Sequence, residues 1–130
     1  MNTATHTSAI SEDAKLVIEV MNEKEDVQLD FSADAISWLD TYIKQHHNTL
    51  SEDDKTVLCE KFGAFVGETI RRNYGGQWVQ ANENNWMIVF DDQAKTEPFE
   101  MVSASLDRRS SLTSLYQQIP ELFDNNAMRN

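Results

Sequence analysis

The sequence predicts an α+β fold, in which three N-terminal helices precede an antiparallel β-hairpin and one or two helices return over it. A helical run over residues 51–74 is the first observation, and it stops at Gly75-Gly76, a typical helix C-cap. Two short runs with alternating apolar residues follow at 77–81 and 86–90, joined by a polar turn. Because a two-stranded sheet is marginal alone, we expect its apolar face to lie on the third helix.

The length of 130 residues predicts one domain with one core, since a chain of this size buries roughly two thirds of its unfolded surface. Residues 1–10 are small and polar and are expected to form a flexible tail. The domain is predicted to span residues 11–123, followed by a frayed C-terminus over residues 124–130. No internal repeat and no second domain are indicated.

The first two helices have recognisable start signals. Ser11 is a plausible N-cap for a first helix that runs to about residue 24, and Ser32 caps a second helix. Phe31 and Ile36 occupy the two positions of a hydrophobic staple around that second cap. The predicted buried faces are Leu16, Val17, Val20 and Met21 in the first helix, and Ala35, Trp38, Leu39, Tyr42, Ile43 and His46 in the second.

The third helix is the predicted central element. Ser51 and Asp54 resemble a capping box at its start. Cys59, Gly63 and Gly67 lie along one strip, where each glycine costs roughly 1 kcal/mol relative to alanine, so another element is expected to approach closely there. A helical wheel places Glu60, Lys61, Ala64, Glu68, Arg71 and Arg72 on the polar arc opposite the apolar one.

In the C-terminal third of the chain, the sequence allows two types of secondary structure for one segment. Residues 91–96 are predicted to be a loop. Pro98 would then open a fourth helix over residues 98–106, with an edge strand as the alternative. Ser110 or Ser111 would cap a fifth helix. In the hairpin before them, Trp86, Ile88 and Phe90 are expected to share one face, and Trp78 alternates with Gln80 on the partner strand.

The excess of acidic over basic residues limits the classes of molecule that the protein is expected to bind. The chain has 22 acidic and 11 basic residues, a net charge of −11, which opposes binding to nucleic acids. The same charge would steer the chain towards a basic protein. No stretch approaches the 18 apolar residues of a membrane span, and the N-terminal segment has neither a basic region nor an apolar run. With a single cysteine, these features predict a cytoplasmic protein that does not bind membranes.

Candidate catalytic and metal-binding residues are few. His46 and His47 are adjacent, point in different directions on a helix and lack a third ligand, so we expect no metal and no cofactor. Cys59 lies among apolar residues and is expected to behave as a small hydrophobe rather than as a nucleophile. The serines lack a G-x-S-x-G elbow. The sequence therefore predicts that the protein is not an enzyme.

Two groups of residues have alternative interpretations. Glu68, Arg71 and Arg72 have the spacing of surface ion pairs, although either arginine could instead hold the hairpin backbone or an acidic ligand. The aromatic residues beside the hairpin turn, Tyr74, Trp78 and Trp86, are expected either to pack in the core or to form a protein-binding hot spot. The candidate partner-binding residues are Tyr74, Trp78, Asp91, Asp92, Glu97 and Glu100.

The segment 63–99 resembles a small bacterial domain family of unknown function, in which a G-x-x-x-G-E helix precedes G-x-W, a hairpin and a proline that opens the next helix. The matching residues are Gly63, Gly67, Glu68, Gly76, Trp78 and Pro98. That family is similar to some immunity proteins of bacterial toxin systems. The resemblance implies a protein that neutralises a toxin, which the net charge of −11 predicts to be basic, and it adds no catalytic residue. Two alternatives remain open: a small-molecule pocket lined by Trp78, Trp86, Tyr42 and Phe65, and an adaptor that self-associates through the hairpin edge.

Overall fold

The computed structural model describes residues 3–82, 85–90 and 94–122, with the backbone alone for residues 3–7. The predicted α+β class is confirmed. The helices are α1 (Thr3–Glu25), α2 (Ala33–His46), the short 3₁₀ helix η1 (His47–Thr49), α3 (Glu52–Tyr74), α4 (Pro98–Leu106) and α5 (Leu112–Gln117). The strands are β1 (Gln77–Asn82), β2 (Asn85–Val89) and β3 (Lys95–Thr96).

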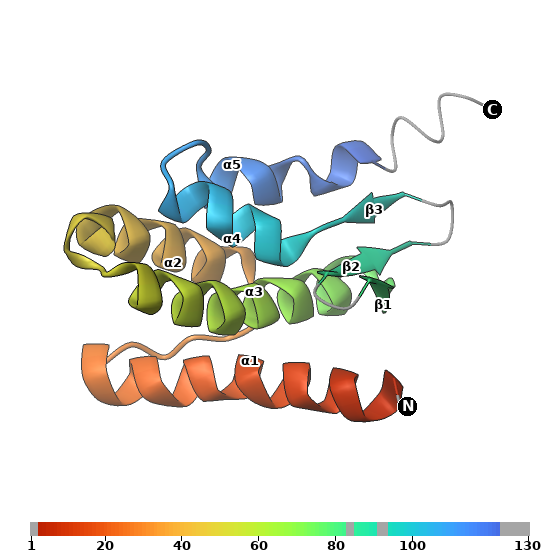
Figure 1. Ribbon diagram of the computed structural model, residues 1–130, viewed down its shortest axis with the longest axis horizontal. Coiled ribbons are helices and arrows are strands. Elements are labelled where there is room, and N and C mark those ends of the chain that lie inside the picture. The colour runs from red at the N-terminus through yellow and green to blue at the C-terminus, as the bar shows by residue number, and fades with distance from the viewer. Residues whose placement is uncertain (1–2, 83–84, 91–93, 123–130) are drawn as a thin grey trace.

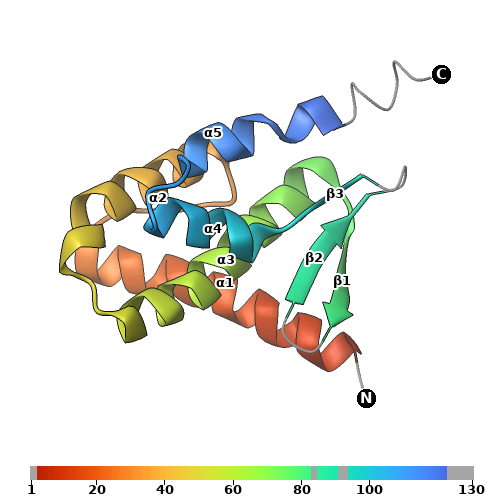
Figure 2. The same ribbon diagram turned by 45° about the horizontal axis from the view of Figure 1, so that its top comes forward.

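Helix α3 lies in the middle of the molecule (Figure 1). α1 runs antiparallel along one side of it and α4 runs antiparallel along the other, so α3 contacts both. α2 packs mainly on α5 at the far side of the core. The sheet stands at the C-terminal end of α3, and β3 leads directly into α4 (Figure 2).

Three helices begin where side chains can satisfy the free backbone amides of a first turn. The Ser32 hydroxyl accepts from the Ala35 amide at 3.3 Å, and the Ser111 hydroxyl accepts from the Ser114 amide at 3.3 Å. At the start of α3 the bonds are reciprocal: the Asp54 amide donates to the Ser51 hydroxyl at 3.0 Å, and the Ser51 amide donates to the Asp54 carboxylate at 3.4 Å. These three predicted caps are confirmed.

Helix α1 differs from its prediction. It begins at Thr3, inside the segment expected to be a tail, so Ser11 lies within the helix and is not its cap. The residues that α1 buries against the core are Ile10, Ala14, Val17 and Met21. They recur every three or four positions and form one narrow stripe, whereas Leu16 lies off this stripe and is 42% exposed.

The glycine strip of α3 does receive the hairpin, and it receives the start of α4 as well. A Cβ atom on Gly67 would lie 2.1 Å from the Trp78 ring, and one on Gly63 would lie 2.3 Å from the Phe99 ring. Trp78 and Phe99 also contact each other, with ring centroids 5.7 Å apart. The two glycines therefore allow two aromatic rings to lie directly on the α3 backbone.

The sheet has the order β1-β2-β3 and is antiparallel throughout. Trp78 pairs with Ile88 and Gln80 with Trp86, so the predicted hairpin is confirmed. The predicted loop over 91–96 is wrong at Lys95–Thr96, which pair with β2. Residues 98–106 form a helix and not the edge strand that was the alternative.

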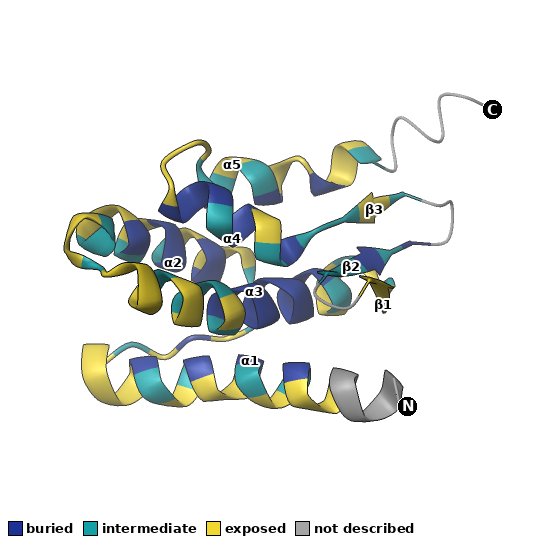
Figure 3. Cartoon of the chain, in the orientation of Figure 1, coloured by how far each residue is buried: buried dark blue, intermediate teal, exposed yellow. Residues whose placement is uncertain are grey.

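The core is continuous from α1 through α3 to α4 and α5 (Figure 3). In α3 every residue from Phe62 to Ile70 is buried, including Ala64 and Glu68, which the wheel had placed on the polar arc. The wheel was wrong there because α1, the hairpin and α4 enclose this half of α3 on several sides. Among the described residues, no helix is both long and apolar enough to cross a membrane.

Candidate functional site

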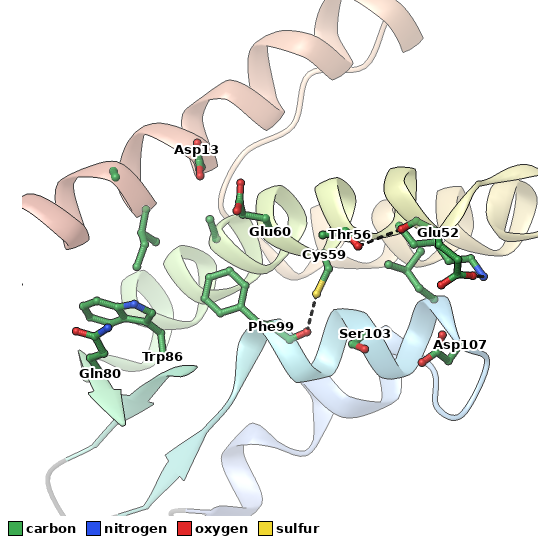
Figure 4. A pocket seen from close by; sticks show the side chains of 15 residues that line it. Asp13, Glu52, Thr56, Cys59, Glu60, Gln80, Trp86, Phe99, Ser103 and Asp107 are labelled. Atoms are coloured by element: carbon green, nitrogen blue, oxygen red, sulfur yellow. Dashed lines mark hydrogen bonds and ion pairs between the residues drawn. The ribbon is translucent and has the colours of Figure 1, made fainter. Parts of the chain in front are cut away.

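A cavity of about 700 Å³ opens over the N-terminal half of α3 (Figure 4). α1 forms one side of this cavity, α4 forms the other, and the hairpin closes one end. We call it the α1–α4 groove. Its apolar lining consists of Ile10, Cys59, Ala64, Trp86, Phe99 and Leu106.

Helical spacing explains why α3 forms the floor. Glu52, Lys55, Thr56, Cys59 and Glu60 recur every three or four residues, so their side chains share one face. This face precedes the enclosed half of α3, and α4 reaches it only from one side. The side chains here are mostly half-buried or exposed, which leaves the floor accessible from solvent.

The rim of the groove carries an excess of acid. Four carboxylates line it, those of Asp13, Glu52, Glu60 and Asp107, against the single ammonium group of Lys55. Lys61 joins two of them from outside, with its Nζ 3.0 Å from Asp13 and 3.4 Å from Glu60. Hydrogen bonding to Asp13 raises the pKa of Lys61, so this lysine stays charged and ties α1 to α3. The other two rim carboxylates are also paired, Glu52 with Lys55 at 3.7 Å and Asp107 with Arg109 at 3.5 Å, so a cationic ligand would compete with these side chains.

Cys59 lies in the floor of the groove. Its thiol donates a hydrogen bond to the Phe99 carbonyl at 3.3 Å. Burial, together with the nearby carboxylates of Glu100, Asp107 and Glu60, raises the pKa of the Cys59 thiol. The thiol is therefore neutral at physiological pH, in keeping with the small hydrophobe expected from the sequence.

Trp78 was a candidate for partner binding, and the structure places it in the core instead. It is 7% exposed, and its indole Nε1 donates to the buried Glu68 carboxylate at 2.8 Å. Arg71 bonds the same carboxylate at 3.2 Å, while the Arg72 guanidinium lies 4.1 Å from the centre of the Phe31 ring. Both arginines thus have partners inside the chain.

The other candidate residues are scattered. Tyr74 is half-buried beside Tyr116, with ring centroids 6.0 Å apart. Glu97 precedes the first residue of α4, and Glu100 pairs with Arg109 at 3.1 Å. Asp91 and Asp92 lie outside the described residues. None of the candidate residues that the structure describes lines the groove.

The pocket expected between the hairpin and the helices is also corrected. Of its four predicted lining residues only Trp86 lines the groove. Phe65 and Trp78 are buried in the core, and Tyr42 packs on Phe62 with ring centroids 5.8 Å apart. The groove was missed because its walls come from segments far apart in the chain. The sequence feature that indicates such a groove is the half-polar, half-apolar helical face of residues 52–60.

A second polar cluster links α2 to α5. Asp40 is 3% exposed and accepts hydrogen bonds from the Ser111 hydroxyl at 2.8 Å and the Thr113 amide at 3.3 Å. Burial alone would raise the pKa of Asp40, but the hydrogen bonds from Thr113 and Ser111, with the charge of Lys44, hold it below its usual value. Asp40 therefore stabilises the start of α5.

In the part of the chain that the structure describes, no group of three His, Cys, Asp or Glu side chains is placed so that it could hold a metal ion. His46 packs on Tyr42, with ring centroids 4.3 Å apart. Comparison with known proteins finds no matching family model, no matching curated protein and no matching solved structure. The groove is therefore identified as the candidate functional site from its own geometry and charge.

Proposed function

We propose that this protein is a non-enzymatic binding module that holds and neutralises a basic protein. The observation that carries the proposal is a groove with an apolar lining and an acidic rim, on a chain of net charge −11. The apolar part of the lining supplies affinity because it excludes water from the contact. The acidic rim speeds the encounter with a cationic partner and disfavours acidic competitors.

The resemblance to a family similar to immunity proteins supports a toxin as the partner. Its motif residues share one structural role: Trp78 and Pro98 lie on Gly67, and Glu68 accepts the hydrogen bond from Trp78. The motif thus describes how the hairpin and α4 are fixed on α3, which is what shapes one end of the groove. The link to toxin neutralisation itself rests on the resemblance.

Co-purification tests the proposal. The tagged protein is expressed together with the protein encoded beside it and purified at about 0.1 M and about 1 M NaCl, which shortens the Debye length from about 10 Å to about 3 Å. We expect a stoichiometric complex with a basic polypeptide at low salt and its partial loss at high salt. Absence of any complex at low salt would contradict the proposal, as would an acidic partner.

A small-molecule site is the second candidate, favoured by one observation. The groove volume of about 700 Å³ falls within the range of about 300–1,000 Å³ that small-molecule pockets occupy. Cationic metabolites would then raise the melting temperature and change the fluorescence of Trp86. Replacing Trp86 by Phe would remove the fluorescence response and leave the thermal response in place.

A further inference from the structure

The dimensions of the α1–α4 groove suit an α-helix. Its floor along α3 extends from Glu52 to Ala64, about 18 Å at 1.5 Å per residue. α4 runs alongside this floor, whereas α1 crosses it and lines the groove through Ala9, Ile10 and Asp13 (Figure 4). A helix of about three turns has this length, and its side chains at every third or fourth position would meet the apolar lining.

Backbone hydrogen bonding favours a helix over an extended segment. The sides of the groove are the helices α1, α3 and α4, whose main-chain groups bond within each helix. An extended peptide would find no strand edge along these walls and would lose water from its amides without compensation. A helix satisfies its own backbone and offers only side chains to the groove.

The charges are unevenly distributed along the groove. Glu52, in the first turn of α3, and Asp107, which follows α4, lie at one end, and Gln80 and Trp86 lie at the other (Figure 4). Glu52 pairs with Lys55 at 3.7 Å and Asp107 with Arg109 at 3.5 Å. Exposed pairs of this kind are weak and exchange readily with a competing cation.

We infer that the basic partner inserts an amphipathic α-helix into the α1–α4 groove, with its apolar face on the half-buried Cys59, Trp86 and Phe99 and its Lys or Arg residues beside Glu52 and Asp107. This inference rests on the proposed function and adds the partner segment and its orientation. The neutral end of the groove, at Trp86, receives the uncharged end of the helix.

The test uses a synthetic probe, a peptide with blocked ends and about 12 residues, which spans about 18 Å as a helix. Leucines at positions i, i+3, i+4 and i+7 form its apolar face, and lysines are concentrated near one end. A scrambled peptide of identical composition and charge is the control, because it retains the electrostatic attraction and loses the apolar face. Titration calorimetry measures affinity, and circular dichroism measures the helix formed on binding.

Two kinds of protein variant locate the site. Ser103, on α4, lines the groove, so Ser103→Trp would fill it without changing charge. Glu52→Lys with Asp107→Lys reverses the acidic end, and Glu19→Lys with Glu23→Lys makes the same charge change at exposed α1 positions outside the groove. Each variant is first checked for the parent far-ultraviolet spectrum and a cooperative melt.

We expect at least ten-fold weaker binding of the amphipathic peptide to Ser103→Trp and to the Glu52/Asp107 reversal. The Glu19/Glu23 reversal should change the affinity by less than three-fold, and the scrambled peptide should bind ten-fold more weakly than the amphipathic one. Equal binding of the peptide to Ser103→Trp overturns the inference. So does equal binding of the scrambled peptide, which would indicate attraction to surface charge alone.

Failure of the inference and failure of the proposed function are distinguishable. If the basic partner co-purifies with Ser103→Trp as well as with the parent protein, the proposed function stands and the helix-in-groove inference is wrong. If no basic partner is captured at low salt, the proposed function fails. Binding of a cationic metabolite in place of the peptide likewise overturns the helix as occupant.

Discussion

At the scale of single residues, the bond between Trp78 and Glu68 holds the hairpin to α3. The donor and the acceptor are ten residues apart, and Glu68 is 4% exposed. A buried carboxylate is tolerated only when it is hydrogen-bonded, and Arg71 supplies the remaining contacts at 3.2 and 3.3 Å. The strand that carries Trp78 is therefore held on α3 by a hydrogen bond as well as by packing.

Replacing Trp78 by Phe should destabilise the protein by about 1–3 kcal/mol, because the Glu68 carboxylate loses a donor while buried. Urea unfolding monitored by circular dichroism measures the change. Trp38→Phe is the matched control, since Trp38 is half-buried and stacks on Tyr42. A cost no larger than that of Trp38→Phe would show that the bond contributes nothing.

Asp40 should make stability depend on pH. Its pKa is lower in the folded state than in the unfolded chain, so the unfolded state takes up the proton first. The stability it contributes is complete above the usual Asp pKa of about 4 and is lost as the pH falls through the folded-state value. Asp40→Asn should cost about 1 kcal/mol at neutral pH and flatten the fall in stability below about pH 4.

The measurement is urea unfolding of both proteins at a series of pH values between about 2 and 7. Glu19→Gln removes a carboxylate that is exposed on α1 and should keep the parent pH profile. A profile of Asp40→Asn that parallels the parent would contradict the assigned role.

The burial of some polar residues could not be predicted from the sequence. Glu68 and Asp40 are polar, so a hydropathy pattern places them on the surface, yet both are buried against partners 10 to 73 residues away. Their burial depends on donors that only the tertiary fold supplies. The partial burial of Cys59 was easier to predict, because Leu58 and Phe62 beside it in α3 are apolar.

At the scale of elements, local chemistry explains which predictions succeeded. Ser32, Ser51 and Ser111 cap their helices through atoms at most three residues away, so the sequence contains the whole motif. By contrast, β3 is only two residues long and is held by its pairing with β2. Elements of that kind depend on tertiary contacts and carry little signal of their own.

Gly67→Ala tests the close contact between α3 and the hairpin. Alanine would favour a helix by about 1 kcal/mol, but its Cβ would lie 2.1 Å from the Trp78 ring. We expect a net destabilisation of about 1–3 kcal/mol, as in other overpacked cores. Chemical denaturation measures it.

A second background identifies the clashing partner. In a Trp78→Ala protein the same Gly67→Ala change should become nearly neutral or stabilising, because the ring is absent. If Gly67→Ala stabilises the parent protein, the close approach of Trp78 is not a constraint on this position.

At the scale of the whole molecule, the net charge of −11 acts on stability as well as on binding. Repulsion between the carboxylates opposes the compact state, and salt screens it. The melting temperature should therefore rise by a few degrees between about 0.01 M and about 0.5 M NaCl. Differential scanning calorimetry measures it.

The Glu19→Lys/Glu23→Lys protein provides the comparison, since it is less negative and should show a smaller rise. A melting temperature that falls with salt in the parent protein would mean that its ion pairs, such as Lys61 with Asp13, outweigh the repulsion.

The fold class could be predicted from the sequence because it follows from periodicity and turn residues along the chain. The groove could not, because Ile10, Cys59 and Leu106 come from three separate helices. Its existence depends on how far α1 and α4 stand apart across α3, a spacing that Phe99 on Gly63 helps to set.

The pairing of α2 with α5 has a consequence during synthesis on the ribosome. α2 is complete at His46, whereas α5 begins at Leu112, 66 residues later. At a translation rate of about 5–20 residues per second, the apolar face of α2 waits roughly 3–13 s for this partner. The acidic residues that surround the first two helices would keep the emerging chain dispersed through that interval.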